Sequence, residues 1–111
     1  MDLNRSEADG RAVVLRPSGR LNLTTAAVLR QSVAAEVDGG RVRVVLDLAD
    51  VSFVDSSGLG AIVGGLKSAR QAGGDLRIAA AGEQVRTVLE LTNLDRVLRP
   101  HDTVEDALGG W

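Results

Sequence analysis

The chain has 111 residues, the length of one ordinary domain. Its 13 basic and 15 acidic side chains give a net charge of −2, which argues against a nucleic-acid-binding or polybasic membrane-binding surface. Cysteine is absent and His101 is the single histidine, so disulfides, thiolate metal sites and multi-histidine metal sites are excluded. The first ten residues are polar, and no apolar run approaches the ~18–20 residues of a membrane span. We therefore expect a cytoplasmic domain without a signal peptide or membrane segment.

The N-terminal segment predicts a β-hairpin. The apolar run inside residues 11–18 is typical of a strand, and we expect it to end near Pro17. Residues 3–8 are expected to pair with it as a preceding strand. The turn between them would lie at Asp9-Gly10, a favourable hairpin dipeptide.

A helix and a buried strand come next. Apolar residues spaced by three and four predict a helix over 24–38, capped by Thr24 or Thr25 and stopped by the glycines at 39–40. The segment 42–48 is rich in valine and almost continuously apolar, as expected for a strand that is buried on both faces.

The C-terminal half repeats the alternation of helix and strand. Leucine, isoleucine and valine at positions i, i+3, i+4 and i+7 predict a helix over 57–72, which two glycines end. The further expected elements are a strand over 75–81, a helix over 83–93, a short strand over 97–99 and a final helix capped by Thr103, with Asp106 at its third position.

Strands that alternate with helices imply parallel pairing through right-handed crossovers. We therefore expect a single α/β domain over residues 1–111, with its core over about 11–108. Its central sheet would have four to five strands, mostly parallel, with an antiparallel edge at the N-terminus. About four helices would pack on this sheet.

The most informative segment is 55–60, Asp-Ser-Ser-Gly-Leu-Gly, between a buried strand and a helix. Ligand sites in open α/β sheets form there, at the carboxyl ends of strands. Asp55 and the two serines can cap the helix, whereas Gly58 and Gly60 weaken its first turn by ~1 kcal/mol each relative to alanine. Two interpretations stay open: a partner approaches the backbone closely here, or caps and small residues pack on a neighbouring element.

Hydrolytic catalysis by this segment finds little support in the sequence. A nucleophile elbow needs glycines two positions before and after the serine, but Ser57 is flanked by Asp55 and Leu59. His101 is the only histidine that could serve Ser57 as a base. A lone histidine is more often a surface residue than part of a triad.

Nucleotide binding and phospho-acceptor chemistry are also poorly supported. A phosphate-binding loop fails because Leu66 separates the glycines from Lys67, which lies in mid-helix. A two-half dinucleotide-binding fold needs a longer chain. A receiver domain would use Asp55 as its phospho-acceptor, but acidic metal ligands are absent after the strand over 11–18.

Several segments spread over almost the whole chain carry a family resemblance. They are Val14–Leu21 with Thr24-Thr25-Ala26, Val45–Leu48, Val51–Gly60, Ala72-Gly73-Gly74 and Val104–Leu108. Together they resemble the STAS domains, specifically the bacterial anti-sigma factor antagonists. Val51–Gly60 is the most specific of these segments. The resemblance implies a STAS-like fold over the single domain.

The resemblance also implies a function. In this family the second serine of Asp-Ser-Ser-Gly is phosphorylated, and this serine corresponds to Ser57. The unphosphorylated protein would bind an anti-sigma factor, itself a serine kinase with a histidine-kinase-like ATPase fold, and so release a sigma factor. Phosphorylation of Ser57 would end this binding, and a serine phosphatase would restore it. No enzymatic activity, cofactor or metal is implied.

The expected partner-binding residues are Asp55, Ser56, Ser57, Gly58, Leu59, Gly60, Asn22 and Thr24. We expect Asn22 and Thr24 on the same surface as Ser57, because both loops should leave the carboxyl ends of neighbouring strands. Asn22 departs from the family, whose members often carry an acidic residue there, and this difference concerns partner specificity. The alternatives are a STAS scaffold or transporter-associated subunit without serine phosphorylation, and a small hydrolase or nucleotide-binding protein.

Overall fold

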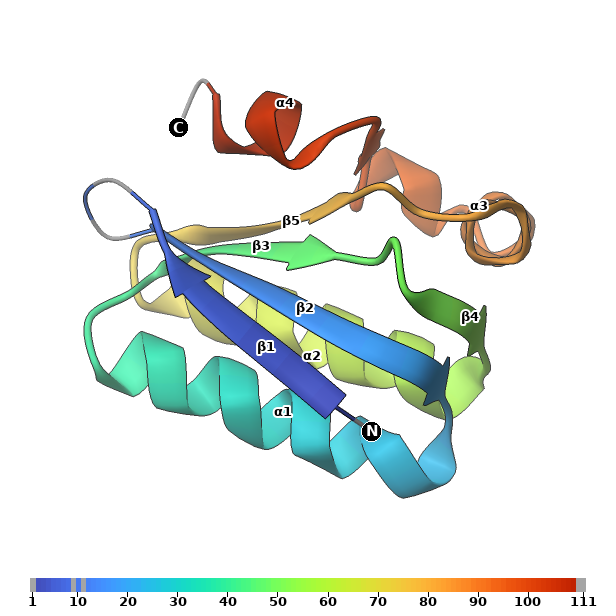
Figure 1. Ribbon diagram of the computed structural model, residues 1–111, viewed down its shortest axis with the longest axis horizontal. Helices are drawn as coiled ribbons and strands as arrows, with labels where there is room; N and C mark the ends of the chain where they lie inside the picture. The colour runs from blue at the N-terminus through green and yellow to red at the C-terminus, as the bar shows by residue number, and fades with distance from the viewer. Residues whose placement is uncertain (1, 9, 11, 110–111) are drawn as a thin grey trace.

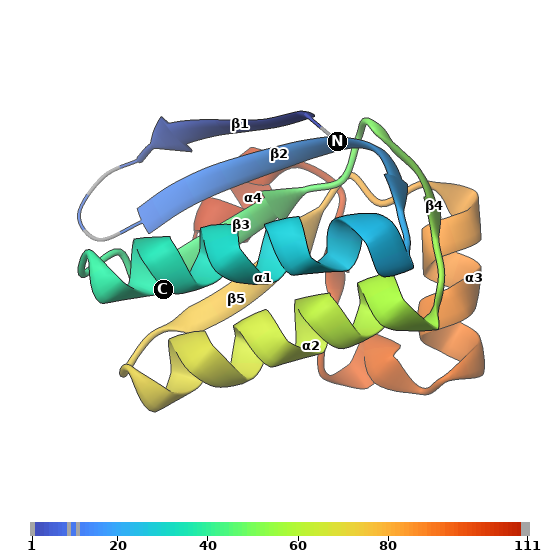
Figure 2. The ribbon, with the colours of Figure 1, turned by 90° about the horizontal axis from the view of Figure 1, so that it is seen from below.

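The computed structural model describes residues 2–8, 10 and 12–109, which form a mixed β-sheet with helices on both faces (Figure 1). In chain order the elements are β1 (Asp2–Glu7), β2 (Ala12–Leu21), α1 (Leu23–Asp38), β3 (Arg43–Asp47), β4 (Val51–Val54), α2 (Ser56–Gln71), β5 (Asp75–Ala79), α3 (Glu83–Leu91), the 3-10 helix η1 (Leu94–Arg96), β6 (Pro100–His101) and α4 (Val104–Leu108). Helices α1 and α2 lie side by side on one face of the sheet, and α4 lies on the other (Figure 2). The predicted α/β fold class is confirmed.

The sheet has the order β1-β2-β3-β5-β6, and β4 pairs with β2 beside this path. The β1–β2 pair is antiparallel and all other pairs are parallel, as expected for an antiparallel N-terminal edge. The hairpin of β1 and β2 is therefore confirmed, although Asp9 of its expected turn lies outside the described residues.

Strand β2 continues through Pro17 to Leu21, so the expected end near the proline is wrong. Ala12–Leu15 pair with β3, and Gly19–Leu21 pair with β4 after a register shift between Gly19 and Arg20. Pro17 lies between these two paired segments, where the absence of its N–H removes no bond to a parallel neighbour.

Strand β4 is a separate element, which the apolar pattern of the sequence does not distinguish from the preceding apolar run. The chain turns after Asp47, whose carboxylate accepts a hydrogen bond from the Ala49 N–H at 3.1 Å, and the Val51 N–H donates to the Leu48 carbonyl at 3.1 Å. This turn gives the sheet a sixth strand and places β4 against the end of β2.

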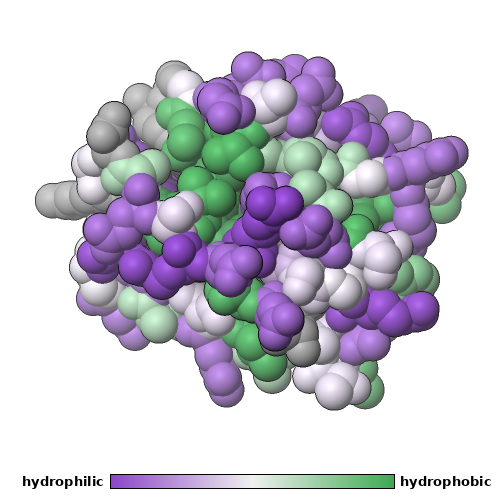
Figure 3. Space-filling view, viewed as in Figure 1, coloured by the Kyte–Doolittle hydropathy of each residue, from purple (hydrophilic) through white to green (hydrophobic). Residues whose placement is uncertain are grey.

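Two apolar clusters cover the two faces of the sheet. The larger cluster joins the inner faces of α1, α2 and α3 to the sheet and includes Leu15, Leu29, Leu46, Ile62 and Ile78, each at most 1% exposed. The smaller cluster lies beneath α4 and consists of Val45, Ala79 and Ala107 with partly buried neighbours. Because α4 has only five residues, it leaves apolar surface visible between the hairpin and α4 (Figure 3).

The helix ends follow local polar chemistry, with one correction. Asn22 caps α1, and Thr25, the third residue of the helix, accepts a hydrogen bond from the Asn22 N–H and so completes a capping box. The expected cap by Thr24 or Thr25 is therefore wrong. Thr103 caps α4 through the Asp106 N–H at 3.1 Å, as expected. No described helix combines the length and apolarity that crossing a membrane requires.

The last short strand lies at Pro100–His101. The expected position at 97–99 is therefore wrong. Helix α3 ends at Leu91, and Asn93 adopts a left-handed conformation with φ of 58° before η1. Because the chain passes through η1 and residues 97–99 before it reaches the edge of β5, β6 begins to pair with β5 only at Pro100, later than the apolar pattern indicates.

Candidate functional site

The start of α2 is built on the end of β4. Asp55 is the N-cap, and its carboxylate accepts a hydrogen bond from the Gly58 N–H at 2.9 Å. Its own N–H donates to the Leu21 carbonyl at 3.2 Å, which ties the end of β4 to the end of β2. The capping role expected for Asp55 is therefore confirmed, and the segment 55–60 begins at the carboxyl end of a strand.

Gly58 makes a close contact possible between the first turn of α2 and the end of β2. A Cβ atom built on Gly58 would lie 2.3 Å from the Leu21 carbonyl oxygen, closer than any side chain tolerates. The backbone that approaches Gly58 is thus the chain's own β2. Gly60 differs, because the nearest atom to its Cβ position is the Arg30 Nη2 at 3.4 Å, at the end of a flexible side chain.

Ser57 is the second residue of α2 and is half-buried. Within the described ranges, no group forms a hydrogen bond with its hydroxyl. Backbone N–H groups in the first turn of a helix have no partner inside the helix and favour negative charge nearby. The Gly58 N–H is taken by Asp55, so the N–H groups of Ser56 and Ser57 are the ones left for another acceptor.

Asn22 and Thr24 begin α1 directly after Leu21, whose carbonyl is bonded to Asp55. The N-terminal ends of α1 and α2 lie side by side at the same end of the sheet (Figure 2). The structure therefore brings Asn22 and Thr24 to the end of the molecule that carries Ser57, as expected from the strand order. The Asn22 amide oxygen is engaged by the N–H groups of Thr24 and Thr25, at 3.0 and 3.3 Å.

The segment 55–60 divides into surface and supporting residues. Ser56 is exposed, whereas Asp55, Ser57 and Gly60 are half-buried. Gly58 is buried, and Leu59 is 6% exposed within the large apolar cluster. The Leu59 side chain therefore anchors this surface from below and does not project from it.

Three residues of this region were not singled out by the sequence. Leu23, the first residue of α1, is 77% exposed, which is unusual for a large apolar side chain. Arg20 stacks over the Phe53 ring, with its Cζ 4.5 Å from the ring centroid. The exposed position of Leu23 could be suspected from its place outside the helical apolar stripe, whereas the Arg20–Phe53 pair depends on the register of β2 and β4.

Gln84 of α3 supports the same region from the opposite edge of β4. Its side-chain amide accepts a hydrogen bond from the Val54 N–H at 2.9 Å and donates to the Val54 carbonyl at 3.0 Å. The Gln84 amide thus forms the two hydrogen bonds with the Val54 backbone that a neighbouring strand would otherwise form. No sequence pattern indicates this contact, because it joins residues 30 positions apart.

The residues considered for catalysis lie elsewhere. His101 is in β6, which pairs with β5 and not with β4, and no hydrogen bond joins its side chain to Ser57. Lys67 is exposed on α2, more than two turns after Ser57. In the part of the chain that is described, no three His, Cys, Asp or Glu side chains gather as a metal site would require.

Known proteins are similar to this chain in sequence and architecture. The STAS domain family matches residues 5–107. The Thermotoga maritima protein TM1081, provisionally named an anti-sigma factor antagonist, is 38% identical over 97 residues, 86% of this chain and 86% of that protein. Its crystal structure has a TM-score of 0.88 at 36% identity, covering 96% of this chain and 91% of that chain.

A further relative is the anti-sigma-F factor antagonist RsfB of Mycobacterium tuberculosis. It is 30% identical over 99 residues, which cover 87% of this chain and 79% of that protein. The family match spans nearly all strands and helices, including the segment with Ser57. The chain therefore belongs to the STAS domain family, among the anti-sigma factor antagonists.

Proposed function

We propose that this protein binds an anti-sigma factor, thereby releases a sigma factor, and is switched off by phosphorylation of Ser57. The observation that carries the proposal is the Ser57 hydroxyl, which lies in the first turn of a capped helix and has no hydrogen-bond partner among the described residues. The start of this helix lies beside the start of α1 (Figure 2). The names of the relatives support the class of partner.

The partner-binding surface consists of the first turns of α1 and α2. Asn22 and Thr24 contribute from α1, and Asp55, Ser56, Ser57 and Gly60 contribute from α2, while Gly58 and Leu59 hold the backbone of this surface in place. We add Leu23 to this surface, because a large apolar side chain that is 77% exposed gains from burial by a partner. Its neighbours are polar, as at the rim of a protein interface.

Phosphorylation suits this position for an electrostatic reason. A phosphate on Ser57 adds about −1.5 to −2 charges, which the free N–H groups and the dipole at the start of α2 can accommodate without unfolding the domain. The same charge and bulk oppose a closed interface. As the family resemblance implies, the proposed partner is an anti-sigma factor with serine kinase activity. A serine phosphatase would return Ser57 to its binding-competent form in the cytoplasm.

This function needs no catalysis by the protein itself, and we propose that it has none. A scaffold or transporter-associated STAS subunit is the second candidate, and it differs in leaving Ser57 unmodified. Incubation with the cognate anti-sigma factor and ATP, followed by mass spectrometry of the phosphosite, separates the two. We expect phosphate on Ser57, loss of the signal in Ser57→Ala, and its retention in the neighbouring Ser56→Ala.

The switch is tested by titration calorimetry against that anti-sigma factor. Ser57→Asp should weaken binding by roughly 30- to 5000-fold, the range for an unpaired charge in a closed interface, while Ser57→Ala should bind like the wild type. Gln31→Glu adds the same charge to an exposed position in the middle of α1 and should leave binding unchanged.

Thermal melts of the same variants separate a surface effect from unfolding. A negative charge near a helix start stabilises by ~0.3–1 kcal/mol, so Ser57→Asp should melt at the wild-type temperature or slightly above it. Wild-type affinity in both Ser57→Asp and the phosphorylated protein would leave Ser57 as a structural residue and refute the switch.

A further inference from the structure

Arg30 of α1 reaches across to the first turns of α2. Its Nη2 atom lies 3.4 Å from the Cβ position of Gly60, and helices α1 and α2 lie side by side here (Figure 2). Because Gly60 has no side chain, the guanidinium group can lie close to the helix backbone. Arg30 also lines a groove of about 270 Å³ between the two helices, together with Ala34, Gly64, Gly65 and Ser68.

Ser57 lies on the side of α2 that faces this guanidinium group. Gly60 follows Ser57 by three positions, and residues three or four apart on a helix are neighbours whose Cβ atoms are ~5–6 Å apart. Gly64 follows by seven positions, about two turns, and belongs to the lining of the groove. Ser57 therefore continues the line of Gly60 and Gly64 to the start of the helix.

The charge of Arg30 has no partner within the domain as far as it is described. Arg30 is exposed, and its guanidinium group forms no hydrogen bond or ion pair with any described residue. Its neighbours one turn away on α1 are uncharged: Ala26, Ala27, Val33 and Ala34. An anion that arrived beside Gly60 would therefore not have to displace an acidic side chain.

Two other cations of this part of the molecule are placed differently. The Arg20 guanidinium group stacks over the Phe53 ring at 4.5 Å. Leu21 and Val54, the next residues of the two strands, belong to the cluster beneath α1 and α2, so the alternation of side chains places Arg20 on the other face of the sheet. Lys67 follows Ser57 by ten residues, about 15 Å along the helix axis. Of these three cations, Arg30 is the one beside Ser57.

A phosphate on Ser57 would meet a negative charge that is already present. Asp55 lies two positions earlier, and its carboxylate accepts the Gly58 N–H at 2.9 Å as the cap of α2. The phosphate adds about −1.5 to −2 charges close to this carboxylate, and like charges at short range repel each other. A cation close to the phosphate offsets this repulsion.

We propose that Arg30 binds the phosphate group of phosphorylated Ser57, so that an ion pair across Gly60 joins α1 to α2. The inference rests on the proposed phosphorylation of Ser57 and adds what the phosphate contacts in the switched-off state. The phosphate oxygens extend two bonds beyond the serine oxygen, which brings them within reach of the guanidinium group. A guanidinium group binds phosphate through two parallel hydrogen bonds. The phosphate then lies between the two helices that form the partner-binding surface.

The test uses protein in which phosphoserine is incorporated at position 57 during synthesis, so no kinase is needed. Phosphorus NMR over a pH series measures the second pKa of this phosphate. The Arg30 charge should hold this pKa down, and in Arg30→Gln it should rise by about half a pH unit or more, the effect of one charge at ~4–5 Å in water. Lys67→Gln, which removes a charge from an exposed position of α2, should leave it unchanged.

Arg30→Lys separates charge from geometry. Lysine keeps the charge and loses the planar fork, so the pKa of the phosphate should lie between those of the wild type and Arg30→Gln. Thermal melts of the four proteins, each with serine and with phosphoserine at position 57, measure the same contact through stability. Phosphorylation should raise the melting temperature more in the wild type and Lys67→Gln than in Arg30→Gln, because only the last lacks the ion pair.

Two outcomes would overturn the proposal. One is a phosphate pKa in Arg30→Gln equal to that of the wild type. The other is an equal rise in Arg30→Gln and Lys67→Gln, which would reduce the effect to general charge attraction. Either result, combined with loss of anti-sigma factor binding on phosphorylation, would refute the Arg30 contact and leave the switch intact. A normal rise in Arg30→Gln, with undiminished binding of the phosphorylated protein, would refute the switch and support the contact.

Discussion

The missing side chain of Gly58 lets the end of β2 pass directly over the first turn of α2. The carbonyl oxygen of Leu21 lies only 2.3 Å from the place where a Cβ of residue 58 would lie, and it also accepts the hydrogen bond of the Asp55 N–H. A single residue thus connects the position of Ser57 to the end of the neighbouring strand. The glycine does not keep the surface open for a partner; it makes room for the chain itself.

Gly58→Ala should therefore destabilise the protein by about 1–3 kcal/mol or more, because the added methyl group meets a backbone atom that cannot move aside easily. Gly64→Ala is the control in the same helix: its Cβ meets nothing within 4 Å, and alanine should stabilise by about 0.5–1 kcal/mol. Urea unfolding measures both. Similar effects of the two substitutions would contradict the close contact.

Asn22 has a structural task that its expected role in partner binding did not include. Its amide oxygen caps α1, so Asn22→Ala should cost about 0.5–2 kcal/mol of stability. Asn22→Asp keeps an accepting oxygen and adds a negative charge at the helix start, so its stability should equal or exceed that of the wild type.

Melting temperatures of the two Asn22 variants test whether the Asn22 side chain stabilises the protein as the cap of α1. Calorimetry of Asn22→Asp with the anti-sigma factor then measures the effect of the acidic residue that the family resemblance leads us to expect at this position, without a change in the fold. Destabilisation of Asn22→Asp to the level of Asn22→Ala would argue against the cap.

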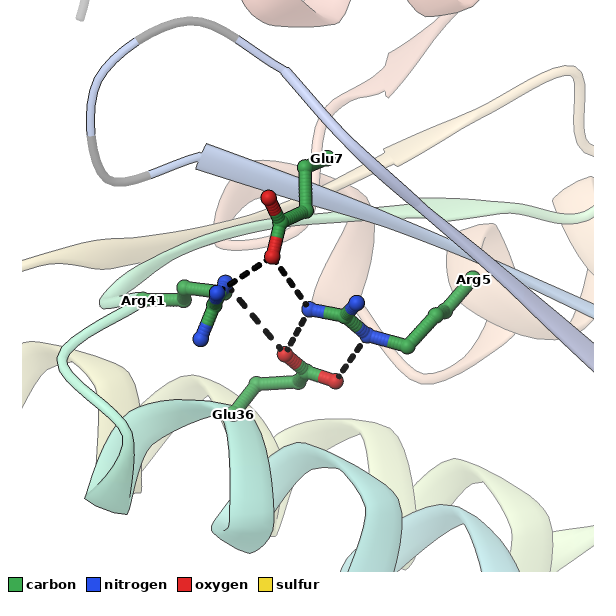
Figure 4. A network of polar contacts seen from close by, with 4 residues as sticks. All are labelled: Arg5, Glu7, Glu36 and Arg41. Carbon is green, nitrogen blue, oxygen red and sulfur yellow. Dashed lines mark hydrogen bonds and ion pairs between the residues drawn. The ribbon is translucent and has the colours of Figure 1, made fainter.

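At the scale of elements, β1 is attached to the domain by more than its pairing with β2. Arg5 and Glu7 of β1 form a network with Glu36 near the end of α1 and with Arg41 before β3 (Figure 4). Both guanidinium nitrogens of Arg5 that face Glu36 lie 2.8 Å from its carboxylate oxygens, and Glu7 pairs with Arg41 as well as Arg5. The network fastens an edge strand whose side chains are otherwise mostly exposed.

The network makes the stability of this edge depend on pH. The hydrogen bond from Arg5 holds the pKa of Glu36 below its usual value, and the hydrogen bond from Arg41 does the same for the pKa of Glu7. A carboxylate with a lowered folded-state pKa stabilises the fold above its unfolded pKa of about 4.3 and loses this contribution as pH falls through the folded value.

We expect wild-type stability to fall more steeply below pH ~4.3 than that of Glu36→Gln, which has no carboxylate to protonate there. At pH 7 Glu36→Gln should be less stable by up to about 1 kcal/mol, as for a partly exposed ion pair. Glu90→Gln, an exposed residue of α3, is the control. Unfolding free energies between pH 3 and pH 7 test this, and parallel curves for wild type and Glu36→Gln would contradict it.

At the scale of the whole molecule, the sheet separates two ends with different chemistry. The carboxyl ends of β2 and β4 carry the first turns of α1 and α2, with serine, threonine and an exposed leucine. The opposite end of α2, together with the 96–101 segment, carries an arginine-lined cavity, whose wall includes Arg70, Arg77, Arg96 and Arg99. Both ends are built on the same buried cluster, which joins α1, α2 and α3 to the sheet.

The sequence by itself determined the features that depend on neighbouring residues. The helices over 23–38 and 56–71 follow from apolar residues three and four apart. The caps at Asp55 and Thr103 follow from side chains that accept hydrogen bonds from N–H groups three positions on. These interactions are local, so a pattern within one segment is enough to indicate them.

Only the tertiary structure decided how distant segments meet. The continuation of β2 past Pro17 depends on β4 as a second partner, and Val54 depends on an amide 30 residues away, at Gln84. Position 58 needs a glycine because the Leu21 carbonyl approaches it closely. The arginine-lined cavity forms only where residues 96–101 return to β5. Strand pairing and close backbone contacts are non-local, because they depend on segments brought together by burial of a shared core and leave no periodic trace in either segment alone.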